Sequence, residues 1–220
     1  MMYKVILTGA TGMVGEGVLH ECLNSPLISD VLIINRRPSG CSNPKLKEIV
    51  HTDFHDLSSV EAQLKGYDAC FFCLGVSSVG MNKEKYRHMT YDLTMHFAQT
   101  VSKVNSSMIF CYVSGAGTDS TEKGWLAWAR VKGKVENDLM KLPFKSVYNF
   151  RPGMIEPTPG LSNTLSLYKY FGWLNTLLNR FAPGSICRLE QVGNAMINAL
   201  VKGYSKSVLE VDDIKKLAAA

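Results

Sequence analysis

Apolar runs of strand length recur along the chain, and each is followed by a longer stretch in which apolar residues return every three or four positions. The runs are continuously apolar rather than alternating, which is typical of strands buried on both faces. In chain order they are KVILTG, VLIINR, KEIVHTD, ACFFCLG, SSMIFCYVSG, SVYNFRPG and SVLEV.

The stretches between these runs predict helices, since their apolar positions fall on one helical face. The expected helices cover residues 13–23, 58–64, 83–104, 125–142, 161–181 and 190–201. Alternating strands and helices favour right-handed crossovers in a parallel sheet. We therefore expect an α/β fold with a doubly wound, mainly parallel Rossmann sheet and helices on both faces. No repeat, low-complexity segment or long linker divides the chain, which predicts one domain over residues 1–220.

The composition changes after RPGMIEPTPG, where prolines and glycines lead into the aromatic-rich segment LSLYKYFGWLNTLLNRF. We expect residues 157–189 to form a small helical cap that packs on the carboxyl end of the sheet and walls a substrate pocket. A membrane-surface or partner helix is the alternative, because apolar side chains surround most of this segment. Lys169 and Gly172 interrupt it, so it is too short for a membrane span. The last residues, KLAAA at 216–220, resemble a cloning-vector remnant and are left out of the expected fold.

Charge and composition exclude several classes of protein. The net charge is +5, with basic residues scattered among acidic ones, so the sequence does not predict a nucleic-acid surface. Glycines interrupt the apolar run of MMYKVILTGATG at once, so it fits neither a signal peptide nor a membrane span, and a cytoplasmic location is expected. Six cysteines without a secretory signal indicate reduced core residues. The two sulfurs of CFFC, Cys70 and Cys73, should point to opposite faces of a strand.

Three glycines stand three residues apart in ILTGATGMVG, between the first apolar run and the first helix. Gly9 and Gly12 permit a tight bend and close approach of a ligand, and Gly15 lets the helix lie on the strand. The amides of this turn and of the helix start then carry partial positive charge, which suits a pyrophosphate. We therefore expect dinucleotide binding here, with Thr11, Met13 and Val14 as further binding residues.

The end of the second strand distinguishes the two nicotinamide cofactors. A carboxylate there would bind the ribose 2′-hydroxyl and repel a 2′-phosphate, but this strand ends in Asn35, Arg36 and Arg37. Two guanidinium groups can pair with a phosphate, so NADP is favoured over NAD. The alternative is that both arginines lie on a solvated turn.

After the third strand, HTDFHD contains Asp53, which could accept a hydrogen bond from the adenine amino group. The same stretch superficially resembles a metal cluster. His51 and His55 have no further His or Cys at ligand spacing, so we expect no metal site.

The order of the motifs TGATGMVG, NRR, HTDFHDL, FFCLGVSS, YVSGAG, VKGKVE and RPG resembles that of the short-chain dehydrogenase/reductase superfamily. Their spacing is similar to that of its atypical, epimerase-related members, and closest to the small Tat-interacting-protein-like branch. The resemblance covers the chain to about Glu156.

This resemblance implies roles for residues at the carboxyl ends of the later strands. Cys73, Leu74 and Gly75 would run beside the adenosine-side ribose. Ser114 stands in the place of the catalytic serine, and Lys132 in that of the lysine that holds the nicotinamide ribose. Pro152 and Met154, within residues 152–155, would approach the nicotinamide carboxamide. The alternatives are a polar strand end for Ser114 and a solvated helix face for Lys132.

One position departs from the family pattern. The family places a tyrosine four residues before the lysine, and WARVK has Trp128 there. An indole does not ionise in a useful range, so Trp128 cannot transfer the proton. Substitute donors could be Tyr86, Tyr91, His88 or Tyr112, which an extended strand directs to the same face as Ser114.

Two functions remain open at this point. One is an NADP(H)-dependent oxidoreductase acting on a small carbonyl, alcohol or sugar-derived substrate, with Ser114 polarising the oxygen. The other is a non-catalytic NADP(H) sensor or protein-interaction module, for which the substitution at Trp128 argues. Chemistry without net redox, such as epimerisation, is a third alternative. The substrate, and the choice between a homodimer and another protein partner, are not determined by the sequence.

Overall fold

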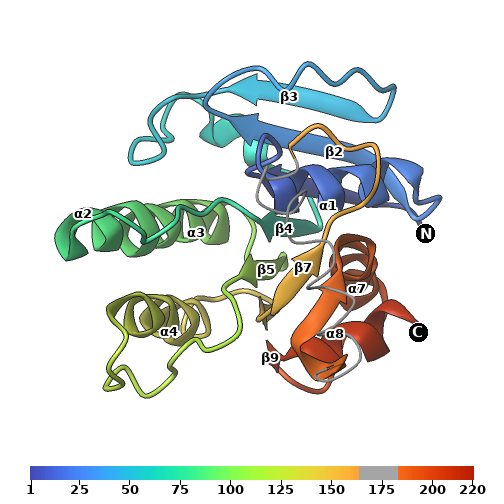
Figure 1. Ribbon diagram of the computed structural model, residues 1–220. Coiled ribbons are helices and arrows are strands. Elements are labelled where there is room, and N and C mark those ends of the chain that lie inside the picture. The colour runs from blue at the N-terminus through green and yellow to red at the C-terminus, as the bar shows by residue number, and fades with distance from the viewer. Residues whose placement is uncertain (164–182) are drawn as a thin grey trace.

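A parallel sheet of seven strands forms the centre of the computed structural model, which describes residues 1–163 and 183–220 (Figure 1). Its strand order is β3 (Leu46–Val50), β2 (Ile28–Asn35), β1 (Tyr3–Thr8), β4 (Ala69–Phe72), β5 (Ile109–Val113), β6 (Ser146–Phe150) and β9 (Val208–Leu209). Two short strands, β7 (Met154–Glu156) and β8 (Ile186–Arg188), pair beside it. All of these pairs are parallel.

Successive residues of a strand face opposite sides of this sheet, and both sides are buried. Val5 and Leu7 of β1 belong to one hydrophobic core, and Ile6 between them belongs to the other. In CFFC, Cys70 lies in the second core and Cys73 packs against the first, which confirms that their sulfurs face opposite sides. Burial on both sides explains why the strands are continuously apolar.

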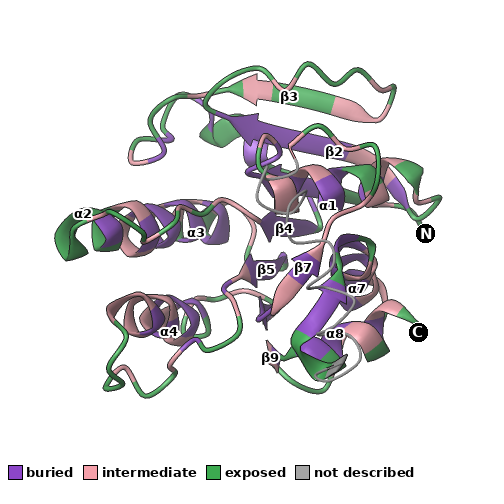
Figure 2. Cartoon of the chain, viewed as in Figure 1, coloured by how far each residue is buried: buried purple, intermediate pink, exposed green. Residues whose placement is uncertain are grey.

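Helices cover both faces, so the doubly wound prediction is confirmed (Figures 1 and 2). One face carries α1 (Met13–Asn24), α7 (Leu189–Lys202) and α8 (Val211–Ala218). The other carries the short 3-10 helix η1 (Glu61–Leu64), α2 (Lys83–Arg87), the π-helical segment η2 (His88–Asp92), α3 (Leu93–Val104) and α4 (Ala127–Leu139). A 3-10 turn, η3 (Pro183–Ser185), precedes β8.

Several expected helices differ in detail. Residues 58–64 form only the turn η1, because Asp56 binds the amide of Ser58 through its side chain and Gly66 follows with φ of 81°. The helix expected over 83–104 is present but is divided by η2. The helix expected over 161–181 lies largely outside the described residues, and so does most of the expected cap.

The carboxyl-terminal region contains two elements that the sequence patterns did not indicate, β8 and α8. Leu217 of α8 is buried in the core, and the side-chain amide of Asn198 donates to its carbonyl at 2.8 Å. Residues 216–218 therefore belong to the fold, although the sequence analysis set them aside.

The strand order reverses between β1 and β4: β2 and β3 follow on one side, β4, β5 and β6 on the other. In open α/β sheets, ligands bind at the carboxyl ends of the strands where the order reverses. The topology therefore places a crevice after Thr8 and Phe72, directly at the glycine turn.

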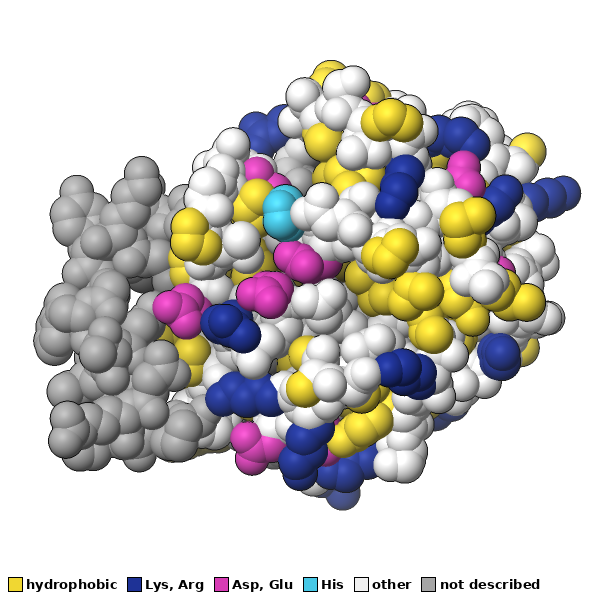
Figure 3. All heavy atoms as spheres, turned by 90° about the vertical axis from the view of Figure 1, so that its right-hand side faces the viewer, with side chains coloured by type: hydrophobic (Ala, Val, Ile, Leu, Met, Phe, Trp, Pro, Cys, Tyr) yellow, Lys and Arg dark blue, Asp and Glu magenta, His cyan; other side chains and the backbone are white. Residues whose placement is uncertain are grey.

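The surface seen in Figure 3 shows basic and acidic side chains interspersed with hydrophobic ones. Within residues 1–163 and 183–220, no helix has both the length and the apolar character needed to cross a membrane.

Candidate dinucleotide-binding site

The turn between β1 and α1 can be built only with glycine at two of its positions. Gly9 has φ of 76°, and a Cβ there would lie 2.8 Å from the backbone of Cys73 and Leu74. A Cβ on Gly15 would overlap the carbonyl of Gly9, so only glycine lets α1 lie this close to the turn. Gly12 is less confined, since a Cβ there would meet the Gly9 carbonyl at 3.4 Å. Its missing side chain leaves space for a ligand.

Backbone amides collect at this turn because α1 begins there. Gly12 is the N-cap residue, and as a glycine it has no side chain with which to cap the helix. The first amides of a helix lack intrahelical partners and carry partial positive charge. The side chains of Met13 and Val14 pack against the core, so these two residues offer their amides rather than their side chains.

A cavity of about 470 Å³ opens in front of the turn. It is bounded by the glycine turn, the end of β2 and the end of β4, which are distant in sequence. The lining residues are Gly9, Thr11, Gly12, Arg36, Arg37, Cys73, Leu74 and Gly75. Eight of the residues expected to bind the dinucleotide are thus brought together around one space.

The end of β2 presents its two arginines to this cavity. Both are exposed, and within the described part of the chain neither forms a hydrogen bond or an ion pair. Asn35 is buried instead: its amide nitrogen donates to Glu48 Oε1 at 3.0 Å, and its Oδ1 has no partner among the residues that the structure describes. Arg36 and Arg37 are therefore the side chains of this strand end that a ligand in the cavity can reach.

The residues present fit a dinucleotide. Two absent side chains leave room for it, and helix amides suit its phosphates. Two guanidinium groups, which have no partner among residues 1–163 and 183–220, supply positive charge.

Asp53 does not line the cavity. Its Oδ1 accepts a hydrogen bond from the amide of His55 at 2.8 Å, which holds the loop after β3. The ring of His55 stacks on that of His88, with centroids 4.2 Å apart. The described residues contain no group of three or more His, Cys, Asp or Glu side chains suited to hold a metal ion.

Ser114 follows β5 at the carboxyl edge, but its hydroxyl faces the protein interior. The hydroxyl donates to Glu136 Oε1 at 2.5 Å and lies 3.1 Å from the carbonyl of Phe150. Ser114 is only 5% exposed, and Glu136 is fully buried. The single hydroxyl hydrogen therefore faces two protein acceptors, which leaves it unavailable to polarise a substrate oxygen in this arrangement.

Glu136 also binds Arg151, the arginine of the RPG motif. Arg151 Nε and Nη2 donate to its two carboxylate oxygens at 3.0 and 2.5 Å. The same guanidinium reaches Ser120 Oγ at 2.5 Å and Glu210 Oε1 at 3.1 Å. A buried ion pair thus connects α4 to the ends of β5 and β6.

Lys132 lies one turn before Glu136 on α4, and its ammonium donates to the backbone carbonyl of Ser114. Burial lowers the pKa of Lys132 to about 8, and the nearby Glu136 carboxylate opposes this shift. The sequence-based interpretation of a solvated helix face does not hold, since the side chain is directed to the end of β5.

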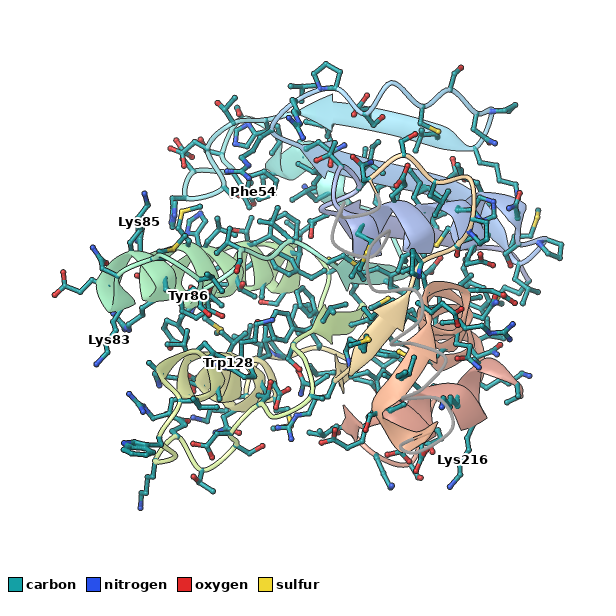
Figure 4. All side chains as sticks on the ribbon, in the orientation of Figure 1. Phe54, Lys83, Lys85, Tyr86, Trp128 and Lys216 are labelled. Atoms are coloured by element: carbon teal, nitrogen blue, oxygen red, sulfur yellow. The ribbon has the colours of Figure 1, made fainter. Side chains whose placement is uncertain are left out.

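Trp128 is partly buried at the start of α4, and its ring lies next to Gly117 in the loop after β5. In Figure 4 it is seen between α4 and α2, on the side of α4 that also faces Tyr86. Tyr86 is only 4% exposed, and burial raises the pKa of its phenol. Neither side chain lines the cavity described above.

Of the other expected donors, two contact protein side chains and one is buried. The Tyr91 hydroxyl donates to Asp138 at 2.7 Å, and Tyr112 is 1% exposed. His88 stacks on His55 at the surface. None of the three side chains lines the cavity described above.

Pro152 and Met154 follow β6. The carbonyl of Pro152 accepts the amide of Ala116 at 2.9 Å, which joins the two loops after β5 and β6. Met154 begins β7 and pairs with Ile186. These residues flank the Ser114 region but do not line the cavity at the glycine turn.

Glu136 is the main site residue that sequence reasoning missed. The motif VKGKVE places it four residues after Lys132, so both lie on one side of α4. That spacing was a usable signal, but it does not reveal that the carboxylate would meet Arg151.

A family model covers the part of the chain that builds the cavity. Residues 5–116 match the model described as the NAD dependent epimerase/dehydratase family. The chain belongs to this family. Members bind a nicotinamide dinucleotide, which agrees with the residues around the cavity.

Protein HTATIP2 of Rattus norvegicus is 29% identical over 207 residues, covering 90% of this chain and 81% of that protein. Protein fmp52 of Emericella nidulans is 26% identical over 216 residues, covering 94% of this chain and 91% of that protein. A short-chain dehydrogenase family protein of Francisella tularensis has a similar fold, with a TM-score of 0.70, 16% identity and 96% coverage of both chains. This member of the epimerase/dehydratase family is thus an atypical short-chain dehydrogenase/reductase close to the HTATIP2 branch.

The expected cytoplasmic location is wrong on this comparison, since fungal relatives are named as mitochondrial proteins. The interrupted apolar run at residues 1–12 argued only against a secretory signal and a membrane span. It carried no information that separates one compartment inside the cell from another.

Proposed function

We propose that this protein binds NADP(H) in the cavity in front of the glycine turn. The observation that carries the proposal is that Arg36 and Arg37 line the same cavity as Gly9 and Gly12. A 2′-phosphate bears close to two negative charges at neutral pH and can accept hydrogen bonds from both guanidinium groups.

In this proposal the pyrophosphate lies on the amides of the β1–α1 turn, and the adenosine-side ribose lies beside Cys73, Leu74 and Gly75. The nicotinamide half then extends toward Lys132, Pro152 and Met154. When bound, the cofactor supplies a hydride at the nicotinamide C4. The protein's own residues orient it.

The proposal is tested by replacing both arginines, Arg36→Ala with Arg37→Ala, and measuring affinity by calorimetry. Removing two charge-assisted contacts should weaken NADPH binding about 100-fold, while NADH binding changes less than about threefold. A double replacement of Lys65 and Lys216 by Ala is the matched control, since it removes the same charge from exposed residues outside the cavity (Figure 4 shows Lys216 on α8). Equal losses for both cofactors would refute the phosphate assignment.

We further propose that the bound cofactor serves oxidoreduction of a small carbonyl, alcohol or sugar-derived substrate. The support is family membership together with Lys132 at the carboxyl end of β5. Single-turnover mixing of NADPH with a panel of aldehydes, ketones and quinones should then oxidise the cofactor. The variant without Arg36 and Arg37 controls for uncatalysed oxidation.

A second function, NADP(H) binding without catalysis, is favoured by the engagement of the Ser114 hydroxyl with Glu136. Tight NADPH binding without oxidation across the whole panel would support it. Trp128→Tyr separates the two further. If the phenol is the only missing group, this variant should raise turnover more than tenfold. No increase would show that the serine is unavailable as well.

A further inference from the structure

Glu136 is a fully buried carboxylate with both oxygens occupied by groups from other elements. Oε1 accepts from Ser114 Oγ at 2.5 Å and from Arg151 Nε at 3.0 Å, and Oε2 accepts from Arg151 Nη2 at 2.5 Å. A carboxylate is buried at a substantial free-energy penalty unless such partners compensate it. Its position is therefore tightly determined.

Helix α4 holds Ser114 at two points. The Glu136 carboxylate binds the hydroxyl, and the Lys132 ammonium binds the backbone carbonyl. Ser114 itself is fixed to β6, because its amide donates to the Phe150 carbonyl at 2.8 Å. The two α4 side chains thus set where the middle of α4 lies relative to the end of β5.

The charged groups near this point come from three elements. Lys132 and Glu136 belong to α4, Arg151 follows β6, and Glu210 precedes α8. The buried phenol of Tyr112 on β5 is a further titratable neighbour of Glu136. Glu210 is 53% exposed at its side chain, so Glu136 is the buried negative charge that balances the two cations.

We propose that Glu136 is a positioning residue for the cofactor: through Ser114 it holds Lys132 at the end of β5, and its charge keeps the Lys132 ammonium protonated for binding the nicotinamide-side ribose of NADP(H). This inference rests on the proposed cofactor. It gives Ser114 a structural task in place of oxygen polarisation.

The pKa of Lys132 agrees with this geometry. Burial lowers it to about 8, and the coulombic effect of Glu136 raises it against that shift. Without the carboxylate, this compensation is absent and Lys132 should lose its proton at lower pH.

The test is the affinity for NADPH between pH 7.0 and 9.5, measured by calorimetry. In this range the 2′-phosphate is fully ionised, since its pKa is about 6. In the unmodified protein, affinity should fall roughly fivefold as pH rises through about 8, because the ammonium loses its charge. Glu136→Gln should bind roughly fivefold more weakly at pH 7.0 and show little further decrease.

Glu210→Gln is the matched control. It removes the exposed carboxylate that binds the same guanidinium, and the decrease in affinity near pH 8 should be retained.

Ser114→Ala keeps the charge of Glu136 but removes the hydrogen bond between the Ser114 hydroxyl and the carboxylate. It should weaken binding while the midpoint of the pH dependence stays in place. Thermal melts identify any variant that fails to fold, and Ser114→Ala then carries the test alone. The proposal would be overturned if Glu136→Gln and Ser114→Ala both bound NADPH as tightly as the unmodified protein and Glu136→Gln kept the same midpoint of the pH dependence.

A measurement without cofactor separates this proposal from the cofactor assignment. The rate at which acetic anhydride acylates Lys132 can be followed by mass spectrometry against pH. The midpoint should lie lower in Glu136→Gln than in the unmodified protein, and an equal midpoint would exclude the electrostatic role. If the unmodified protein does not bind NADPH but the acylation midpoint is still lower in Glu136→Gln, the cofactor assignment is refuted and the electrostatic role of Glu136 is not.

Discussion

The carboxyl edge of the sheet has two regions with opposite character. At the β1–β4 end, Arg36, Arg37 and the amides around Gly12 line an open cavity. At the β5–β6 end, Ser114 and Arg151 are bound to a buried carboxylate. The first region leaves its polar groups for a ligand, and the second uses them to hold the protein together.

This difference separates binding from chemistry. A site that binds without rearrangement needs donors that are not already satisfied by the protein. The arginines meet that condition as far as the described residues are concerned. The hydroxyl of Ser114 does not, since Glu136 and the Phe150 carbonyl face its single hydrogen. The residues at the cavity therefore fit the cofactor binding of the family, whereas Ser114 in this arrangement does not fit the catalytic role that the family resemblance implies.

The largest effect is expected at the glycine turn. A Cβ at Gly15 overlaps the Gly9 carbonyl, so Gly15→Ala should lower the free energy of unfolding by about 3 kcal/mol and abolish NADPH binding. Gly12→Ala has more room and should lower stability by less than about 1 kcal/mol, while still weakening NADPH binding because the methyl group faces the ligand. Urea unfolding and calorimetry measure both. Equal stability losses would contradict the different confinement of the two glycines.

The buried ion pair should show the next largest effect. Arg151→Met leaves Glu136 buried without its main cation and should lower the free energy of unfolding by about 3 to 5 kcal/mol. Lys47→Met removes a surface partner of Asp30 and should change it by less than about 1 kcal/mol. Urea unfolding at pH 7 compares them. If the two losses are similar, the network is not a structural centre of the β5–β6 region.

Lys132 should affect stability in a pH-dependent way. Its folded pKa of about 8 lies below the ordinary 10.5, so between these values the unfolded chain binds one more proton. Stability should therefore rise with pH across this range, by at most about 3 kcal/mol, relative to Lys132→Met.

Lys134→Met is the control on the same helix. The hydrogen bond to Asp138 raises the pKa of Lys134, so this partly exposed lysine should contribute no such rise between pH 8 and 10.5. Chemical unfolding at several pH values gives both differences. A flat difference between the unmodified protein and Lys132→Met would show that Lys132 is not buried as a cation.

The smallest effect is expected at Tyr91. Tyr91→Phe removes one hydrogen bond to Asp138, which keeps its contacts with Lys134 and Lys141. Stability should fall by about 1 kcal/mol or less. NADPH affinity and any single-turnover rate should stay unchanged, because the Tyr91 hydroxyl binds Asp138 of α4 and does not line the cavity. A large decrease in rate would restore Tyr91 as a proton donor.

Much of the fold could be predicted because local patterns encode it. Strands buried on both faces, such as β1, β4 and β5, are continuously apolar, and the helix of residues 13–23 is found nearly as expected. Elements that are stabilised mainly by contacts with residues distant in the sequence were harder to predict. Helix α8 is only eight residues long and is stabilised by packing of Leu217 against α7.

The candidate site divides in the same way. Gly9, Gly12 and Gly15 act through backbone conformation, which their spacing after a strand already indicates. Asp53 was expected at the adenine, but its side chain binds the amide of His55 in its own loop. Short-range competition of this kind is decided by loop conformation, which a sequence pattern does not specify.

The sequence by itself determined a doubly wound α/β sheet, a glycine turn suited to a dinucleotide and two arginines at the end of the second strand. Only the tertiary structure decided that the Ser114 hydroxyl faces Glu136, because its partners lie 22 and 36 residues away on α4 and β6. The direction of a side chain depends on which elements pack around it. Local sequence fixes a turn, whereas the packing of helix against sheet fixes the polar contacts between them.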